Sequence, residues 1–296
     1  MRDQESPLTG KGYPTSLVLK VAGVSSACWY GKRTKGANPS KRGPKTSISD
    51  EDLLVHVRRE IVVSKFHSEG YKKIRARLKR RDIRVGKNRV YRLMEVNSLL
   101  APVRAGTGTS RTHDGTIKTE IPNQMWATDG KKFYTEEDGR CWFFGVIDHC
   151  NDEILAWHAV KKGDRFAAME PVREATRREY GCVAKGIVKD IGLTLRADHG
   201  TQYDSNDFQK EIKFLGFEYS PAFVRSPECN GIIERFHRIL NEQVLSTHQF
   251  KNLDEARKII GKFIDDYNND WILERLGYRT PLEYKEYLKT KAELAA

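Results

Sequence analysis

The sequence predicts a mixed α/β sheet covered by helices, preceded by a small all-helical module. Its size allows this, because 296 residues with 39% hydrophobic side chains are enough for one large or two modest domains. Apolar residues recur at helical spacing before residue 100, and segments rich in aromatic and β-branched residues begin after residue 120. The charge divides at the same place, since residues 1–120 hold 26 Lys/Arg against 11 Asp/Glu and the remainder is slightly acidic.

The composition excludes several classes of protein. No apolar run approaches the roughly 18 residues that a membrane span needs, and the N-terminus lacks the apolar region of a secretory signal. The five cysteines are scattered, so they indicate reduced thiols in a cytoplasmic protein and no redox motif. The eight histidines form no zinc-binding pair, so any metal must be held by carboxylates.

Residues 1–48 are predicted to be a basic N-terminal arm and linker, with a short helix at 16–21 and a Gly, Pro, Ser and Lys-rich stretch at 31–48. Residues 49–104 are predicted to be a helix-turn-helix-like DNA-binding domain, because three short helices with a turn at Gly70 can be drawn there. These helices cover about 50–67, the residues around Ile74 and Leu78, and about 87–97.

The stretch 65–92 is strongly basic, with 12 Lys/Arg and 2 Asp/Glu. Such a run is often only a solvated helix face, but its density between core positions favours a surface that binds duplex DNA. Its affinity would then fall steeply with salt, as condensed counterions are released. The DNA-binding candidates on this module are Lys72, Lys73, Arg75, Arg77, Lys79, Arg80, Lys87, Arg89 and Arg92.

Residues 105–120 are predicted to be a second linker, and residues 121–290 to be the main domain. Its first three strands form a β-meander, and the later elements alternate between helix and strand, which favours a mixed sheet flanked by helices. The expected strands are 124–134, 141–148, 153–160, 193–197 and 217–220, and the expected helices are about 164–180, 206–215, 230–246 and 253–270.

Three carboxylates stand out by their placement. Asp129 lies in the middle of the first strand, Asp198 ends the fourth strand, and Glu234 lies one turn into a helix whose edge it shares with Arg238 and Asn241. Singly, each has an ordinary alternative as a strand-edge, turn or helix-surface residue. Together they are the hard oxygen ligands that a two-metal phosphoryl-transfer site needs.

The spacing and several motifs match a known family. Between Asp198 and Glu234 lie 35 residues, as in the DDE transposases and retroviral-type integrases with a ribonuclease H-like core. More narrowly, the chain resembles the OrfB transposase of the insertion-sequence-three family, which identifies 121–290 as an integrase catalytic core. The matching segments are Pro122–Asp129, Val146–Asp148, Asp198–Ser205, Cys229–Phe236, Gly70–Ile74, Arg89–Met94 and Tyr278–Glu283.

The resemblance implies a DNA transposase that cleaves and joins strands at the ends of an insertion sequence. The residues that would hold two Mg²⁺ ions, with Mn²⁺ as a substitute, are Asp129, Asp198 and Glu234. One ion would activate a water or a DNA 3′-hydroxyl, and the other would stabilise the leaving 3′-oxygen, without a covalent protein–DNA intermediate. His199 and Gly200 would shape the loop around the metals, and Asn230 would order the helix of Glu234.

The implied partners are double-stranded DNA, as terminal repeats and as target, and further copies of the chain in a homo-oligomer on DNA. An OrfA-like partner with a helix-turn-helix and a zipper is also implied, because no sustained heptads occur before residue 120. The expected location is the bacterial cytoplasm at the nucleoid, with no membrane partner.

One position departs from the family pattern. Relatives carry Lys or Arg seven residues after the catalytic Glu, where this chain has Asn241, and Arg238 is the candidate substitute for contacting DNA. His237 is expected to be a helix-surface residue. Asp148 is expected to shape a turn, with a place near the site as the alternative.

Two other functions compete with transposition. A catalytically silent derivative could act as a DNA-binding regulator, although decay would be expected to damage at least one of the three acids. A ribonuclease H-type nuclease acting on RNA–DNA hybrids would share the core, but the basic first part of the chain favours transposition.

Overall fold

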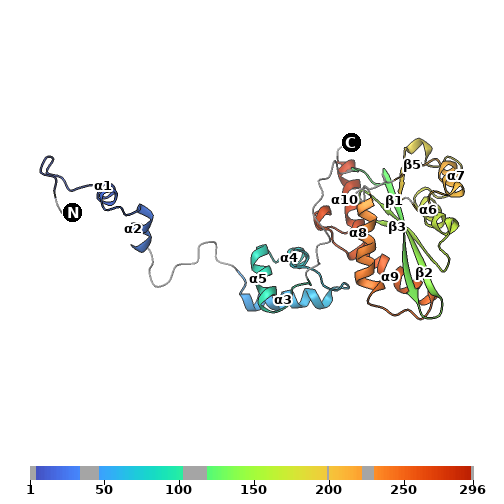
Figure 1. Ribbon diagram of the computed structural model, residues 1–296, viewed down its shortest axis with the longest axis horizontal. Coiled ribbons are helices and arrows are strands. Elements are labelled where there is room, and N and C mark those ends of the chain that lie inside the picture. Colours follow the sequence, from blue (N-terminus) through green and yellow to red (C-terminus); the bar gives the residue numbers. More distant parts are fainter. Residues whose placement is uncertain (1–4, 34–46, 103–118, 199, 222–229, 295–296) are drawn as a thin grey trace. The chain divides into compact units, whose positions relative to one another are not determined.

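The computed structural model describes residues 5–33, 47–102, 119–198, 200–221 and 230–294 (Figure 1). It divides into two compact units, residues 1–49 and 50–296. The first unit carries α1 (Thr15–Val21), where the short helix was predicted, and α2 (Ser26–Arg33). Most of both predicted linkers, residues 34–46 and 103–118, lies outside the described residues.

The second unit begins with the predicted three-helix module. Helix α3 (Asp50–Val63) starts with three acidic residues, which favour the positive end of the helix dipole. Helices α4 (Tyr71–Arg80) and α5 (Lys87–Val96) each follow a glycine in extended conformation. The apolar residues that meet between the three helices are fully or almost fully buried: Leu53, Val57, Ile74, Leu78, Val90, Leu93 and Met94.

A five-stranded mixed sheet follows, in the order β3-β2-β1-β4-β5. The first three strands, β1 (Met125–Thr135), β2 (Gly139–Asp148) and β3 (Ile154–Val160), form the predicted antiparallel meander. The short strands β4 (Thr194–Ala197) and β5 (Glu218–Pro221) run parallel to β1. The predicted fold class, a mixed sheet flanked by helices after a small helical domain, is therefore confirmed.

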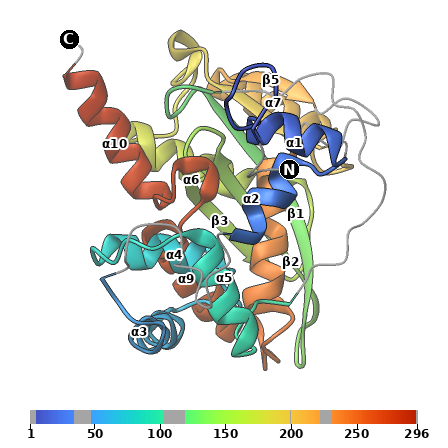
Figure 2. The ribbon, with the colours of Figure 1, turned by 90° about the vertical axis from the view of Figure 1, so that its left-hand side faces the viewer.

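Helices cover both faces of this sheet (Figures 1 and 2). One apolar cluster joins Ala127 and Phe133 of β1 to α8 (Gly231–Leu240) and α9 (Leu253–Asp270). The other joins Trp126 to α6 (Arg165–Tyr180) and α7 (Asn206–Leu215). Since side chains alternate along a strand, Asp129 shares the face of Ala127 and Phe133, which is the face that α8 covers.

The end of the chain differs in detail from the prediction. The single helix expected over 230–246 is α8 followed by a π-helical segment, η3 (Asn241–Leu245). Here the side chain of Gln243 accepts a hydrogen bond from the backbone N–H of His67 at 2.8 Å and donates one to its carbonyl at 3.0 Å.

The last helix was not predicted. Helix α10 (Pro281–Glu293) begins with a capping box of Thr280 and Glu283. It follows the 3₁₀ turn η4 (Glu274–Leu276). A further 3₁₀ turn, η1 (Lys189–Ile191), precedes β4. Among the described residues, no helix is both long and apolar enough to cross a membrane.

Candidate active site

Two of the three predicted acids lie side by side where β4 ends next to the middle of β1, a place that we call the edge of the sheet. Strand β1 pairs in parallel with β4, and Thr128 is the register partner of Ala197. Asp129 is the next residue of β1 and Asp198 immediately follows β4, and neighbouring strands are about 4.8 Å apart. Asp198 is exposed and Asp129 is partly exposed, so both carboxylates reach solvent at this edge.

The third acid comes from the helix that covers this face. Glu234 lies in the first turn of α8 and is exposed, while its neighbour Ile233 is fully buried and holds the helix on the sheet. Partial burial raises the pKa of Glu234, and the negative charges of Asp129 and Asp198 raise it further. The structure thus brings the three predicted acids together, close enough to repel one another.

The donor set suits magnesium without forming a closed cage. In the described part of the chain, no group of three or more His, Cys, Asp or Glu side chains is arranged to hold one metal ion. Mg²⁺ does not require such a cage, because it usually binds through one or two carboxylates and keeps waters or substrate phosphates as its other ligands. A divalent cation would also relieve the repulsion that raises the pKa of Glu234. The chemistry of the three carboxylates therefore fits Mg²⁺, which could be bound by one or two of them and by water or phosphate.

Asp129 has two close neighbours of its own. Its Oδ1 accepts a hydrogen bond from the backbone N–H of Gly130 at 2.7 Å, and its Oδ2 lies 3.3 Å from Nδ1 of His237. The expectation that His237 is a surface residue is wrong, because only 6% of its side chain is exposed.

His237 is buried because the buried face of α8 is wide enough to include it. Ile233, Phe236 and Leu240 form an apolar stripe along the buried face of α8. In the structure His237 is buried as well, which completes the i, i+3, i+4, i+7 pattern of a helix that packs against a sheet. That pattern was the signal in the sequence that could have placed His237 inside.

The predicted site-shaping residues have different surroundings. His199 lies outside the described residues. Gly200 donates its N–H to the carbonyl of Asp198 at 2.9 Å, and a Cβ there would approach Tyr203 to 3.3 Å, so glycine suits this tight turn. Asn230 immediately precedes α8 but makes no side-chain capping bond, and both its side-chain polar atoms are buried without a hydrogen-bond partner among the described residues.

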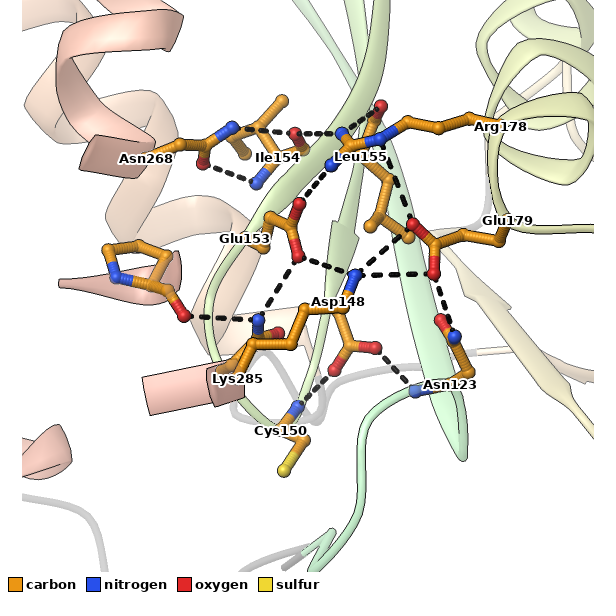
Figure 3. A network of polar contacts seen from close by, with 12 residues as sticks. Asn123, Asp148, Cys150, Glu153, Ile154, Leu155, Arg178, Glu179, Asn268 and Lys285 are labelled. Atoms are coloured by element: carbon orange, nitrogen blue, oxygen red, sulfur yellow. Dashed lines mark hydrogen bonds and ion pairs between the residues drawn. The ribbon is translucent and has the colours of Figure 1, made fainter. Parts of the chain in front are cut away.

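Asp148 lies away from the three acids. Its register partner is Trp126, three residues before Asp129 on β1, and it is 1% exposed. Its carboxylate accepts backbone N–H bonds from Asn123 at 2.6 Å and from Cys150 at 2.7 Å (Figure 3). Burial raises the pKa of Asp148 to about 6. These contacts hold the turn after β2, in agreement with the turn-forming interpretation.

Next to Asp148, a network of buried acids is paired with cations of α6 and of the C-terminal segments. Glu153 is fully buried and contacts Lys285 of α10 at 3.0 Å and Arg178 of α6 (Figure 3). Asp152 accepts two hydrogen bonds from Arg275, at 2.7 and 2.8 Å. These ion pairs join the β2–β3 turn to α6, η4 and α10.

The predicted DNA-binding residues of α4 are largely engaged within the chain. Lys72 pairs with Glu274 at 2.9 Å and Arg80 with Glu283 at 2.6 Å, so both contact the C-terminal segments of the core. Arg77 pairs with Glu69 at 2.7 Å. The ammonium of Lys73 lies 3.1 Å from the ring centroid of Trp271 and 3.7 Å from Glu69.

The remaining candidates fall into two groups. Three bind inside the helical module, where Arg75 donates to the carbonyl of Val85 and the pair Arg89 and Arg92 contacts Asp50. Three are exposed and form no ion pair with any described residue: Lys79, Lys87 and Arg238.

Two family models match the chain. Residues 49–106 match an HTH-like domain, and residues 215–281 match an integrase core domain, a range that includes Glu234 but neither aspartate.

Curated relatives match over almost the whole chain. A protein of Escherichia coli described as the insertion element IS2A uncharacterized 48.2 kDa protein is 28% identical over 288 residues, which cover 94% of this chain and 66% of that protein. The transposase InsD for insertion element IS2A/D/F/H/I/K of Escherichia coli is 27% identical over 299 residues, with 98% of this chain and 96% of that protein covered.

Solved structures of retroviral integrases are also similar. The integrase catalytic core domain of HTLV-2 in complex with magnesium has a TM-score of 0.41 and 18% identity, over 56% of this chain and 97% of that chain. The intasome of simian T-cell lymphotropic virus in complex with PP2A regulatory subunit B56 gamma has a TM-score of 0.47 and 14% identity, over 78% of this chain and 74% of that chain.

Proposed function

We propose that this chain, an InsD-like insertion-element transposase with an HTH-like domain and an integrase core domain, cuts and joins DNA strands at the ends of its element. The observation that carries the proposal is the meeting of Asp129, Asp198 and Glu234 at one sheet edge, where their charges raise the pKa of Glu234. Three separate elements place these acids, so the grouping is a property of the fold and not of one local motif.

The acids would act as metal ligands. When bound, two Mg²⁺ ions would activate a water or a DNA 3′-hydroxyl and stabilise the leaving 3′-oxygen. Asp129 and Asp198 would hold their ligand oxygens on a rigid sheet, and Glu234 would supply its oxygen from α8. Because these acids are exposed or partly exposed, a phosphate of the DNA backbone could reach the same edge. No protein side chain is needed as a covalent nucleophile.

The exposed cations without an ion pair would contact the DNA. Arg238 lies one turn from Glu234 on α8, where it would meet a phosphate near the reacting strand. It would replace the Lys or Arg that relatives carry at the position of Asn241. Lys79 and Lys87 would meet phosphates bound by the helical module. Element ends, target DNA, further copies of the chain and an OrfA-like protein are the proposed partners, in the bacterial cytoplasm.

The test uses the full chain, with any OrfA-like partner, and labelled element ends. We expect strand nicking and joined products with Mg²⁺ or Mn²⁺, and none for the Asp129→Asn variant at the same DNA occupancy. Tight DNA binding with no strand chemistry in either metal would contradict the proposal and favour a DNA-binding regulator. Cleavage of RNA–DNA hybrids without cleavage of element ends would contradict it in favour of a ribonuclease H-type nuclease.

A further inference from the structure

The imidazole of His237 lies against the carboxylate of Asp129. Its Nδ1 is 3.3 Å from Asp129 Oδ2, and 6% of its side chain is exposed. His237 and Glu234 are both on α8, three residues apart, so they leave the helix on neighbouring positions of one face. The same turn of helix therefore supplies one of the acids and a close neighbour of another.

Aromatic side chains hold the ring of His237 in place. The ring meets Phe143 of β2 edge-on, with centroids 5.9 Å apart and an interplanar angle of 81°. It also meets Phe236 at 6.1 Å and 51°. Phe143 and Phe236 are themselves buried in the cluster between the sheet and α9, so His237 has little freedom to turn away from Asp129.

The surroundings of the two ring nitrogens favour one tautomer. Nε2 is buried and has no hydrogen-bond partner among the described residues, whereas Nδ1 faces a carboxylate oxygen. A proton on Nε2 would leave a buried N–H unpaired, which costs about 1–3 kcal/mol, and would turn the Nδ1 lone pair toward Asp129. A proton on Nδ1 avoids both, and a contact of 3.3 Å can shorten once the reactive complex assembles.

We propose that His237 is a positioning residue, which donates a hydrogen bond from Nδ1 to Oδ2 of Asp129 and fixes that carboxylate for metal binding. Gly130 already donates its N–H to Oδ1. With one donor on each oxygen, rotation of the carboxylate is restricted, and its remaining lone pairs stay available to a cation. This inference rests on the proposed function, because it concerns Asp129 as a metal ligand.

Two substitutions separate the hydrogen bond from the packing. His237→Phe keeps a flat ring among Phe143 and Phe236 but removes the donor. His237→Asn is smaller, but its Nδ2 occupies the position of the histidine Nδ1, so it can still donate to Asp129. The readout is the affinity of the DNA-free full chain for Mn²⁺, measured by calorimetry, together with the melting temperature of each metal-free variant.

We expect His237→Phe to weaken Mn²⁺ binding about 10- to 100-fold, as does loss of a hydrogen bond to a metal ligand elsewhere. His237→Asn should stay within a few-fold of the unsubstituted chain even if its melting temperature is lower. The inference would be overturned if His237→Phe bound Mn²⁺ normally and His237→Asn bound it weakly, because the affinity would then depend on packing of the ring. Equal weakening in both variants would overturn it too, since the donor would then be without effect.

Asp129→Asn distinguishes failure of this inference from failure of the proposed function. If Asp129→Asn leaves Mn²⁺ affinity unchanged, Asp129 is not a metal ligand and the proposed function fails with the inference. If Asp129→Asn abolishes binding but His237→Phe does not weaken it, only the role of His237 is refuted.

Discussion

Asp129 and Glu234, at what we propose is the reactive edge of the sheet, differ from the acids of the β2–β3 turn in what neutralises their charge. In the turn, Glu153 pairs with Lys285 and Arg178 (Figure 3). Asp152 pairs with Arg275, and both acids are buried. At the edge, Asp129 and Glu234 form no ion pair with any Lys or Arg that the structure describes, and the pKa of Glu234 is raised. Acids of the first kind join parts of the fold, whereas we propose that Asp129 and Glu234 bind an external cation.

The cations of the helical module divide in the same way. Lys72 and Arg80 of α4 pair with Glu274 and Glu283 of the core, which holds α4 against the C-terminal segments. Lys79 and Lys87 are exposed and form no ion pair with a described residue. A count of basic residues in the sequence cannot distinguish paired from unpaired cations. Only the unpaired ones could bind a DNA phosphate without first breaking an ion pair.

The largest effect should follow from removing one acid at the reactive edge. We expect Asp129→Asn, Asp198→Asn and Glu234→Gln each to lower the rate of strand cleavage by about 10³-fold or more, since a metal ion supplies several kcal/mol of transition-state stabilisation. Melting temperature and DNA affinity should change little, because these substitutions reduce repulsion and leave the basic surface intact. Loss of DNA binding in parallel with cleavage would contradict this separation.

The next effect concerns stability in the β2–β3 turn. Glu153→Gln should lower the free energy of unfolding by about 3 kcal/mol, because it leaves Lys285 and Arg178 without their buried partner. Glu174→Gln is the control, since Glu174 pairs with Arg177 on the exposed face of α6, the helix that also carries Arg178. It should lower the free energy of unfolding by less than about 1 kcal/mol. Denaturant unfolding measures both, and equal effects would show that burial of the pair adds nothing.

Asp148 should give a smaller effect that depends on pH. Its pKa is about 6 in the folded chain and near 3.8 when unfolded, so between these values the folded chain binds a proton that the unfolded chain does not. The stability contributed by this group is therefore fully present below about pH 4 and is lost as pH rises from 4 through 6. Asp148→Asn should lower the free energy of unfolding more at pH 4.5 than at pH 7. The difference between the two losses should be on the order of 1 kcal/mol. A loss that is larger at pH 7 would show the opposite sign.

The smallest expected effect compares single cations in DNA binding. Lys87→Gln should reduce the slope of log affinity against log salt by about 0.9, the value for one phosphate contact in duplex DNA. Lys72→Gln should change the slope less, because its ammonium already lies 2.9 Å from Glu274. Equal changes in the two slopes would mean that the Lys72–Glu274 pair opens on DNA.

Much of this arrangement could be predicted from local sequence. Period-two and period-3.6 patterns predicted all five strands and most helices. They also placed Asp129 within a strand, Asp198 at the end of a strand and Glu234 in the first turn of a helix. The ion pairs of the β2–β3 turn could not be predicted, because Asp152 and Arg275 are 123 residues apart and Glu153 and Lys285 are 132 apart. Local periodicity contains no information about such pairs. His237 was missed for a different reason, since its polar side chain concealed a core position that the spacing of its neighbours indicated.

The two hydrogen bonds between the side chain of Gln243 and the backbone of His67 have a mechanical consequence. A carboxamide that both donates to and accepts from one residue pairs with it as a neighbouring β-strand would. His67 lies just before the helices that would meet the duplex, and Gln243 lies just beyond the helix that carries Glu234. A displacement of His67 relative to α8 must therefore either pull the far end of that helix with it or break both bonds. The helical module and the helix that carries Glu234 are thus linked mechanically through η3.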